Sequence, residues 1–196
     1  MTIDFTGVNK VYDGLTTASV TTATPVANGY VAGDVFSINR TANFVSKNVG
    51  WTNSVLSPVG ISVTAANLTG TDAANYSLVT TGTASAIITP KALSAALVGN
   101  ISKTYDGGTS ATLDNSNYSI TGFVTVGGVT EGTRVTQTSG TYNSRNVLDA
   151  NSASTTLASA QFTPNANTLL SNYVLPTSAT GAAQITPSTL AVSYTG

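Results

Sequence analysis

Two stretches of the sequence, Lys10-Val11-Tyr12-Asp13-Gly14 and Lys103-Thr104-Tyr105-Asp106-Gly107, are nearly identical. In each stretch, a tyrosine that favours a core position is followed by Asp-Gly, whose glycine accepts a positive φ without strain. This order is typical of a strand that runs into a tight turn. We therefore predict a tandem repeat in which each copy is built outward from this corner.

Further landmarks recur in the same order in both halves, which supports the duplication. The spacing between them changes by a few residues, as expected if loops absorb the difference. The matched pairs are Asn48 and Asn146, Tyr76 and Tyr173, and Pro90 and Pro187.

The landmarks predict two similar domains, residues 1–90 and residues 91–187. Each copy is long enough to bury a modest core without disulfides or metals. Within residues 188–196, the stretch from Leu190 to Gly196 resembles that from Leu93 to Gly99, which opens the second copy. We therefore expect these last residues to be the opening strand of a third repeat, and the chain to be a fragment of a larger protein.

Short segments that alternate apolar and polar residues, separated by Gly, Pro, Asn and Asp, predict an all-β fold. Val35–Ile38 and Phe44–Val45 are predicted to be two short strands around a polar turn. No stretch of ten or more residues has apolar side chains at helical spacing. A small sandwich of the immunoglobulin-like kind is the favoured topology for each domain, and a β-grasp-like sheet, which would need one helix, is the alternative.

The junction between the copies reads Ile88-Thr89-Pro90-Lys91-Ala92-Leu93, with no Gly/Ser spacer. Proline fixes its own φ and holds the preceding residue in an extended conformation. The closing strand of one copy is therefore expected to pass almost directly into the opening strand of the next. Copies joined in this way would form a stiff rod.

The composition argues against several classes of partner. Charged residues make up 8% of the chain, against roughly 25% in an average soluble domain. A net charge of -1 with seven scattered basic residues gives no patch for nucleic acid. No apolar run approaches the roughly 20 residues of a membrane-spanning helix, so we expect no membrane insertion. The first residues read directly into a strand and do not resemble a signal peptide.

The chain has neither cysteine nor histidine, which excludes disulfides, thiol nucleophiles, histidine metal sites and catalytic triads. Paired carboxylates could still hydrolyse a glycosidic bond. Of the eight acids, however, the comparison of the two copies matches only Asp13 with Asp106, and both lie in turns where Asp is common. We therefore expect no enzyme activity and predict no catalytic, cofactor-binding or metal-binding residue.

The aromatic residues allow two interpretations. The four tyrosines that recur in register are predicted to be core or corner residues whose hydroxyls bond nearby backbone groups. They are Tyr12, Tyr76, Tyr105 and Tyr173. Three other aromatic residues have no counterpart in the other copy and are the candidates for stacking on a carbohydrate. They are Trp51, Tyr30 and Tyr118.

Four motifs follow one another along the first copy: Lys-x-Tyr-Asp-Gly, Lys47-Asn48-Val49-Gly50, Leu68 to Leu78, and Ile88 to Leu93. Together they resemble the YDG and MBG repeat domains of very large bacterial surface proteins, which are similar to filamentous haemagglutinin-type adhesins. The second copy departs from the pattern, since Arg145 replaces the lysine and Leu148 replaces Gly50.

This resemblance implies a stalk module in an exported adhesin on the surface of a Gram-negative bacterium, where it would project a binding region. The partners implied are neighbouring repeats and, if the module itself binds, a host or surface glycan. Weak self-association through exposed strand edges is a secondary expectation.

Two further hypotheses concern links within each copy. Calcium could bind in Asp- and Asn-rich turns, although a typical site uses several carboxylates and the sequence has no Asp-x-Asp cluster. Some surface adhesins form an isopeptide bond between lysine and asparagine beside an acid. Such a triplet is present in both copies, as Lys10, Asn48 and Asp13 in the first and as Lys103, Asn146 and Asp106 in the second. The alternative is that these residues are a solvated strand-end charge and two turn formers. An intact mass equal to that of the uncross-linked chain would exclude the bond.

Overall fold

The computed structural model describes residues 2–22, 31–80, 84–194 and 196. The chain divides into two compact units, residues 1–91 and residues 92–196. Within the described residues every helix is a three-residue 3₁₀ turn, and all other regular structure is strand. The predicted all-β class is confirmed. The β-grasp alternative needed a helix longer than any that these residues form.

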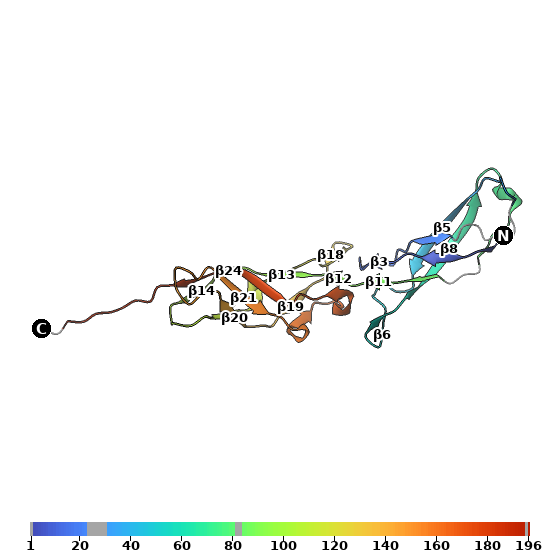
Figure 1. Cartoon of the computed structure of the whole chain (residues 1–196). Helices are drawn as coiled ribbons and strands as arrows, with labels where there is room; N and C mark the ends of the chain where they lie inside the picture. The colour runs from blue at the N-terminus through green and yellow to red at the C-terminus, as the bar shows by residue number, and fades with distance from the viewer. Residues whose placement is uncertain (1, 23–30, 81–83, 195) are drawn as a thin grey trace. The chain divides into compact units, whose positions relative to one another are not determined.

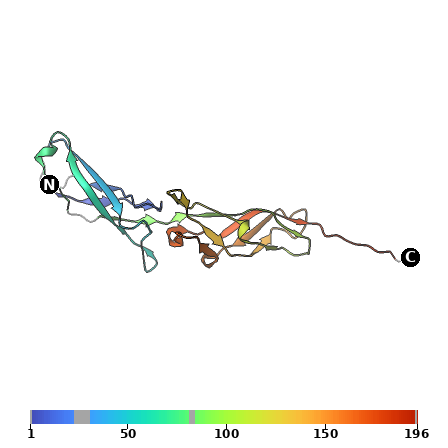
Figure 2. The same ribbon diagram turned by 180° about the vertical axis from the view of Figure 1, so that it is seen from behind.

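The first unit contains short strands around two long ones, β5 and β8, which lie side by side in both views (Figures 1 and 2). In chain order its elements are β1 (Thr2–Ile3), β2 (Phe5–Gly7), β3 (Lys10–Val11), β4 (Val20–Thr22), β5 (Ser37–Phe44), β6 (Trp51–Thr52), β7 (Val55–Leu56), β8 (Val59–Thr69), η1 (Ala73–Asn75), β9 (Val79–Thr80), β10 (Ala84–Ala86) and β11 (Ile88–Thr89).

Strand β5 corrects the prediction of two short strands around a polar turn. Ser37–Phe44 is one continuous strand that pairs antiparallel with β8, with a register shift between Asn39 and Thr41. Arg40, which reads as a turn residue, lies at this irregularity, where its guanidinium carbon is 5.7 Å from the centre of the Phe5 ring. The strand continues through these polar residues, because a β-bulge leaves one extra residue unpaired without ending the pairing on either side.

The second unit is built on a five-stranded sheet in the order β14-β24-β21-β20-β15. Its elements are β12 (Lys91–Ala92), β13 (Ser94–Leu97), β14 (Ile101–Thr104), β15 (Ser110–Thr112), η2 (Asn115–Asn117), β16 (Tyr118–Thr121), β17 (Thr125–Val126), β18 (Val129–Thr130), β19 (Thr133–Val135), β20 (Ser139–Tyr142), β21 (Ser152–Thr156), η3 (Ser159–Gln161), β22 (Phe162–Pro164), η4 (Leu170–Asn172), β23 (Tyr173–Val174) and β24 (Ser178–Thr186).

The inner face of this sheet is closed by a second layer. Strand β13 pairs antiparallel with β16 and crosses β24 where the sequence has Gly181. Strands β19 and β22 form another antiparallel pair. Apolar side chains from both layers form one core, so the unit is sandwich-like. Its buried members are Leu97, Ile101, Ala111, Leu113, Val135, Tyr142, Ala150, Ala153, Leu157, Phe162, Ala179, Ala183 and Ile185.

The two units share the strand pairing that follows from the repeated motif. Strand β3 pairs parallel with β11, with Lys10 opposite Ile88. Strand β14 pairs parallel with β24, with Lys103 opposite Ile185. The motif at the start of each copy is thus joined to the Ile-Thr-Pro segment at its end, which explains why both landmarks recur.

The last residues do not form the strand that was predicted. Residues 187–194 have no strand assignment, and Leu190 and Tyr194 are exposed. A strand requires a neighbour that pairs with it, and the first strands of the second copy find theirs in β16 and β23. That this stretch opens a third repeat stays a prediction.

Candidate functional site

The repeated lysine is the centre of the corner in each unit. The Lys10 ammonium donates to Asp13 Oδ1 at 2.7 Å and to the carbonyl oxygens of Leu15 and Thr17 at 2.7 and 3.0 Å. It also lies 5.3 Å from the centre of the Phe44 ring. These contacts use the three N–H groups of a charged ammonium, so they fit the role of a strand-end cation.

The second unit repeats the ion pair and the ring contact around Lys103. Its ammonium donates to Asp106 Oδ1 at 2.7 Å and lies 5.6 Å from the centre of the Tyr142 ring. The same carboxylate oxygen accepts the backbone N–H of Gly108 at 2.9 Å. Gly14 and Gly107, which follow the two aspartates, have φ values of 78° and 79°, as the Asp-Gly turn predicted.

The charged form of the Asp106 carboxylate is favoured by its neighbours in the second unit. The hydrogen bond from Lys103, helped by the Gly108 N–H, lowers the pKa of Asp106. A carboxyl whose pKa is lower in the folded state stabilises the fold above its unfolded pKa, about 4, and loses this contribution as the pH falls.

We expect Asp106→Asn to lower the thermal midpoint of the second unit near neutral pH, and the difference from wild type to shrink as the pH falls below about 4. Calorimetry across this range measures the effect. A difference that stays constant with pH would show that the charge of Asp106 has no part in it.

The four matched tyrosines differ in burial. Tyr12 is 1% exposed and Tyr173 is 5% exposed, whereas Tyr76 is half-buried. Tyr105 is 41% exposed, which contradicts its predicted core position. The backbone is held alike at both corners, since the N–H groups of Tyr12 and Tyr105 donate to the carbonyls of Thr89 and Thr186. The difference therefore lies in what packs against each ring, which the five-residue motif does not encode.

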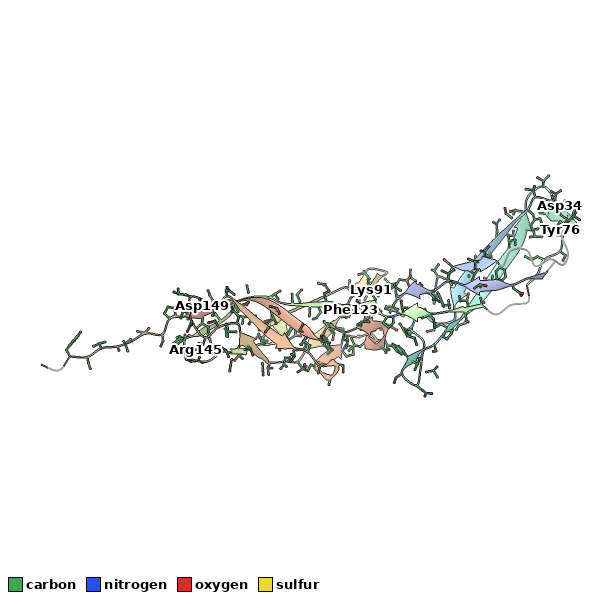
Figure 3. The ribbon with its side chains drawn as sticks, viewed as in Figure 1. Asp34, Tyr76, Lys91, Phe123, Arg145 and Asp149 are labelled. Carbon is green, nitrogen blue, oxygen red and sulfur yellow. The ribbon has the colours of Figure 1, made fainter. Side chains whose placement is uncertain are left out.

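The other two matched tyrosines close a long loop against a carboxylate. The Tyr76 hydroxyl donates to Asp34 and accepts the backbone N–H of Val31. Figure 3 shows Asp34 beside Tyr76 in the first unit. The hydrogen bond to Asp34 raises the pKa of Tyr76, because the neighbouring carboxylate favours the protonated phenol.

Tyr173 makes the same set of contacts in the second unit. Its hydroxyl donates to Glu131 Oε2 at 2.7 Å and accepts the Val124 N–H at 3.2 Å. An aromatic neighbour is also repeated. The ring centres of Phe36 and Tyr76 are 5.4 Å apart, and those of Phe123 and Tyr173 are 5.0 Å apart. Asp34 and Glu131 are therefore counterparts, which corrects the sequence comparison that matched only Asp13 with Asp106.

The three aromatic residues without a counterpart lie in unrelated surroundings. Trp51 is 44% exposed on the β6–β7 hairpin, where Asn53 and Ser54 have positive φ values of 50° and 63°. Tyr118 packs against the core of the second unit and its hydroxyl donates to the Gln137 carbonyl at 2.9 Å. Tyr118 also lines a surface hollow of about 460 Å³ together with Phe123 and Glu131. Tyr30 lies outside the described residues.

The matched asparagines form part of local turns. The backbone N–H groups of Asn48 and Asn146 donate to the hydroxyl oxygens of Ser46 and Ser144, each at 3.1 Å. The Asn146 amide donates to Asp149 Oδ2 at 3.2 Å. Figure 3 shows Arg145 and Asp149 on this loop. These contacts fit the turn-forming interpretation of the asparagines, and the isopeptide hypothesis stays open to its mass measurement.

Neither a cluster of metal-binding side chains nor a membrane-spanning helix is present in the described part of the chain. There, no group of three or more Asp or Glu side chains is placed to hold a metal ion. None of the helices in the same residues is long and apolar enough to cross a membrane. What the repeated residues build in both units is a pair of structural clamps, the Lys–Asp corner and the Tyr–carboxylate pair.

The comparisons with known proteins agree with this picture of a repeated structural unit. The family model described as the YDG domain matches residues 1–84 and 89–181. The comparisons with curated proteins and with solved structures found no match. Since the two matched ranges cover most of the sequence, the chain belongs to the YDG domain family.

Proposed function

We propose that this chain is a structural spacer in the stalk of an exported bacterial adhesin, where YDG units in series project a binding region from the cell surface. Its function would be mechanical, and its partners would be the neighbouring repeats of the same polypeptide. Support comes from the repeated strand pairs β3–β11 and β14–β24, which join the beginning of each copy to its end. The proposal assigns no catalytic role to any residue.

The main support for the proposal is the short connection between the two units. Ile88 and Thr89 form β11, which is paired within the first unit. Lys91 and Ala92 form β12, which pairs with β23 of the second unit. Pro90 is the only residue between the two strands, and its ring restricts φ. A connection of this kind leaves few backbone torsions free, as a spacer that transmits direction requires.

Distance measurements between the units test the proposal. The chain has no cysteine, so Thr64→Cys and Thr121→Cys, both at exposed strand positions, would carry the only spin labels. We expect a single narrow distance distribution, because Pro90 and its paired neighbours limit rotation.

The matched control inserts Gly-Gly-Ser after Pro90, which should broaden the distribution since such linkers behave as flexible coils. Equal widths with and without the insertion would contradict a stiff connection and with it the spacer proposal.

The second candidate function is a module that binds a carbohydrate or another surface ligand. Two observations favour it: the exposed ring of Trp51 and the hollow beside Tyr118. Aromatic faces of this kind can stack on sugar rings. Saturable binding on a glycan array that is abolished by Trp51→Ala or Tyr118→Ala would support this function over the spacer.

A further inference from the structure

The outward face of the five-stranded sheet in the second unit consists almost entirely of hydroxyl side chains. Side chains alternate along each strand, and the positions that point away from the core are Ser or Thr throughout β14, β15, β20 and β21. On β24 the exceptions are Ala182 and Gln184. Along these five strands, all of which the structure describes, this face carries no charged side chain.

The strand register places these hydroxyls in rows across the sheet. Ser110 lies opposite Thr141, Thr141 opposite Ser154, and Ser154 opposite Thr180. A parallel row includes Thr112 opposite Ser139. Neighbouring members of a row are about 4.8 Å apart, and successive rows are about 6.7 Å apart. The face is therefore a regular array of short side chains.

We propose that this hydroxyl face is a homotypic contact surface that packs against the same face of a second copy of the chain. The proposal is independent of the spacer function. A contact between identical faces must be self-complementary, and a hydroxyl meets this condition because it both donates and accepts hydrogen bonds. A face that carried one sign of charge would repel its copy.

The shape of the sheet also favours a second sheet as the occupant. Neighbouring strands are twisted by about 20–25°, so the rows do not lie in a plane that could match a flat, rigid lattice. Two twisted sheets, in contrast, pack face to face with their strands about 30° apart. Short Ser, Thr and Ala side chains allow the two backbones to come close together.

The same chemistry recurs on the main sheet of the first unit. Its antiparallel pairs β5 and β8 place Ser37 opposite Thr69, Asn39 opposite Asn67, and Thr41 opposite Thr64. These six side chains are exposed. Amides, like hydroxyls, both donate and accept, so an uncharged, self-complementary sheet face is present in each unit.

The expected association is weak. Five strands about 4.8 Å apart, with a mean length of five residues, cover roughly 400 Å² on each copy, about half of the roughly 800 Å² that each partner contributes to a standard specific interface. Each hydrogen bond across the contact would replace bonds to water and contribute little on balance. Many copies presented side by side would add their contributions through effective concentration.

Sedimentation equilibrium of the intact chain, measured up to the solubility limit, tests the proposal. Ser154 is the central position, since it lies in the middle of the middle strand. We expect wild type to self-associate, Ser154→Lys and Ser154→Glu each to remain monomeric, and an equimolar mixture of the two variants to associate again. Thr163→Lys places the same charge at an exposed position on β22 and should associate like wild type.

Three outcomes would overturn the proposal. Wild type could remain monomeric at the highest concentration. Association could survive Ser154→Lys, which would indicate pairing through strand edges. The mixture of the Lys and Glu variants could fail to restore association, which would show that the face does not meet its own copy.

Discussion

Replacing Gly181 with alanine is expected to destabilise the second unit by about 3 kcal/mol. An ideal Cβ at this position would lie 2.0 Å from the carbonyl oxygen of Leu97 and 2.8 Å from the Leu97 Cβ. The obstacle is backbone that cannot turn aside, because Leu97 is paired with Tyr118 and its side chain is buried. Relief would require β13 to move away from β24 and open the core between the layers.

Hydrogen exchange followed by mass spectrometry of the intact chain measures this loss and assigns it to a unit. We expect faster exchange in β13, β21 and β24, with the first unit unchanged. Gly108→Ala is the matched control, since its Cβ would meet Asp106 Oδ1 at an ordinary 3.5 Å. Equal effects of the two substitutions would show that β13 does not depend on a close approach at Gly181.

The corner motif could be predicted from the sequence because its structure is local. Asp-Gly specifies the turn, and the paired recurrence of the motif and the Ile-Thr-Pro segment reveals the duplication. Both aspartates accept a hydrogen bond from the lysine three residues earlier. The sequence also predicted the all-β class, because its alternation is short-range.

Contacts between distant residues were missed where the two copies use different residue types. Asp34 and Glu131 are not the same acid, yet each bonds the tyrosine that follows it by 42 positions. The equal spacing between acid and tyrosine was the feature of the sequence by which Asp34 and Glu131 could have been matched. The continuity of strand β5 was missed for another reason, since a bulge at polar residues resembles a turn in any local pattern.

The burial of Tyr105 could not be derived from the motif at all. Tyr12 and Tyr105 each lie two residues after a lysine and directly before Asp-Gly, and they make the same backbone hydrogen bond, but their exposures differ. Local sequence specifies the backbone of a corner, whereas burial depends on side chains that reach it from elsewhere in the fold. Matched residues in the two copies therefore share their turn geometry more reliably than they share a buried position in the core.

Replacing Tyr173 with phenylalanine is expected to cost the second unit about 2 kcal/mol. The substitution keeps the ring, which packs 5.0 Å from Phe123, and removes only the hydroxyl. Glu131 and the Val124 N–H then each lose a hydrogen-bond partner. Glu131 is 9% exposed, so water replaces the lost hydroxyl poorly, and a buried polar group that loses its partner is costly.

The first unit supplies the matched control in the same polypeptide. Tyr76→Phe removes the equivalent hydroxyl from Asp34 and Val31, but Tyr76 and Asp34 are half-buried. Water can replace the hydroxyl there, so we expect a smaller loss than in the second unit. Urea unfolding monitored by hydrogen exchange gives both values. Equal losses would mean that burial does not set the strength of the Tyr–carboxylate clamp, whereas a larger loss in the second unit would show that the same contacts are stronger where water is excluded.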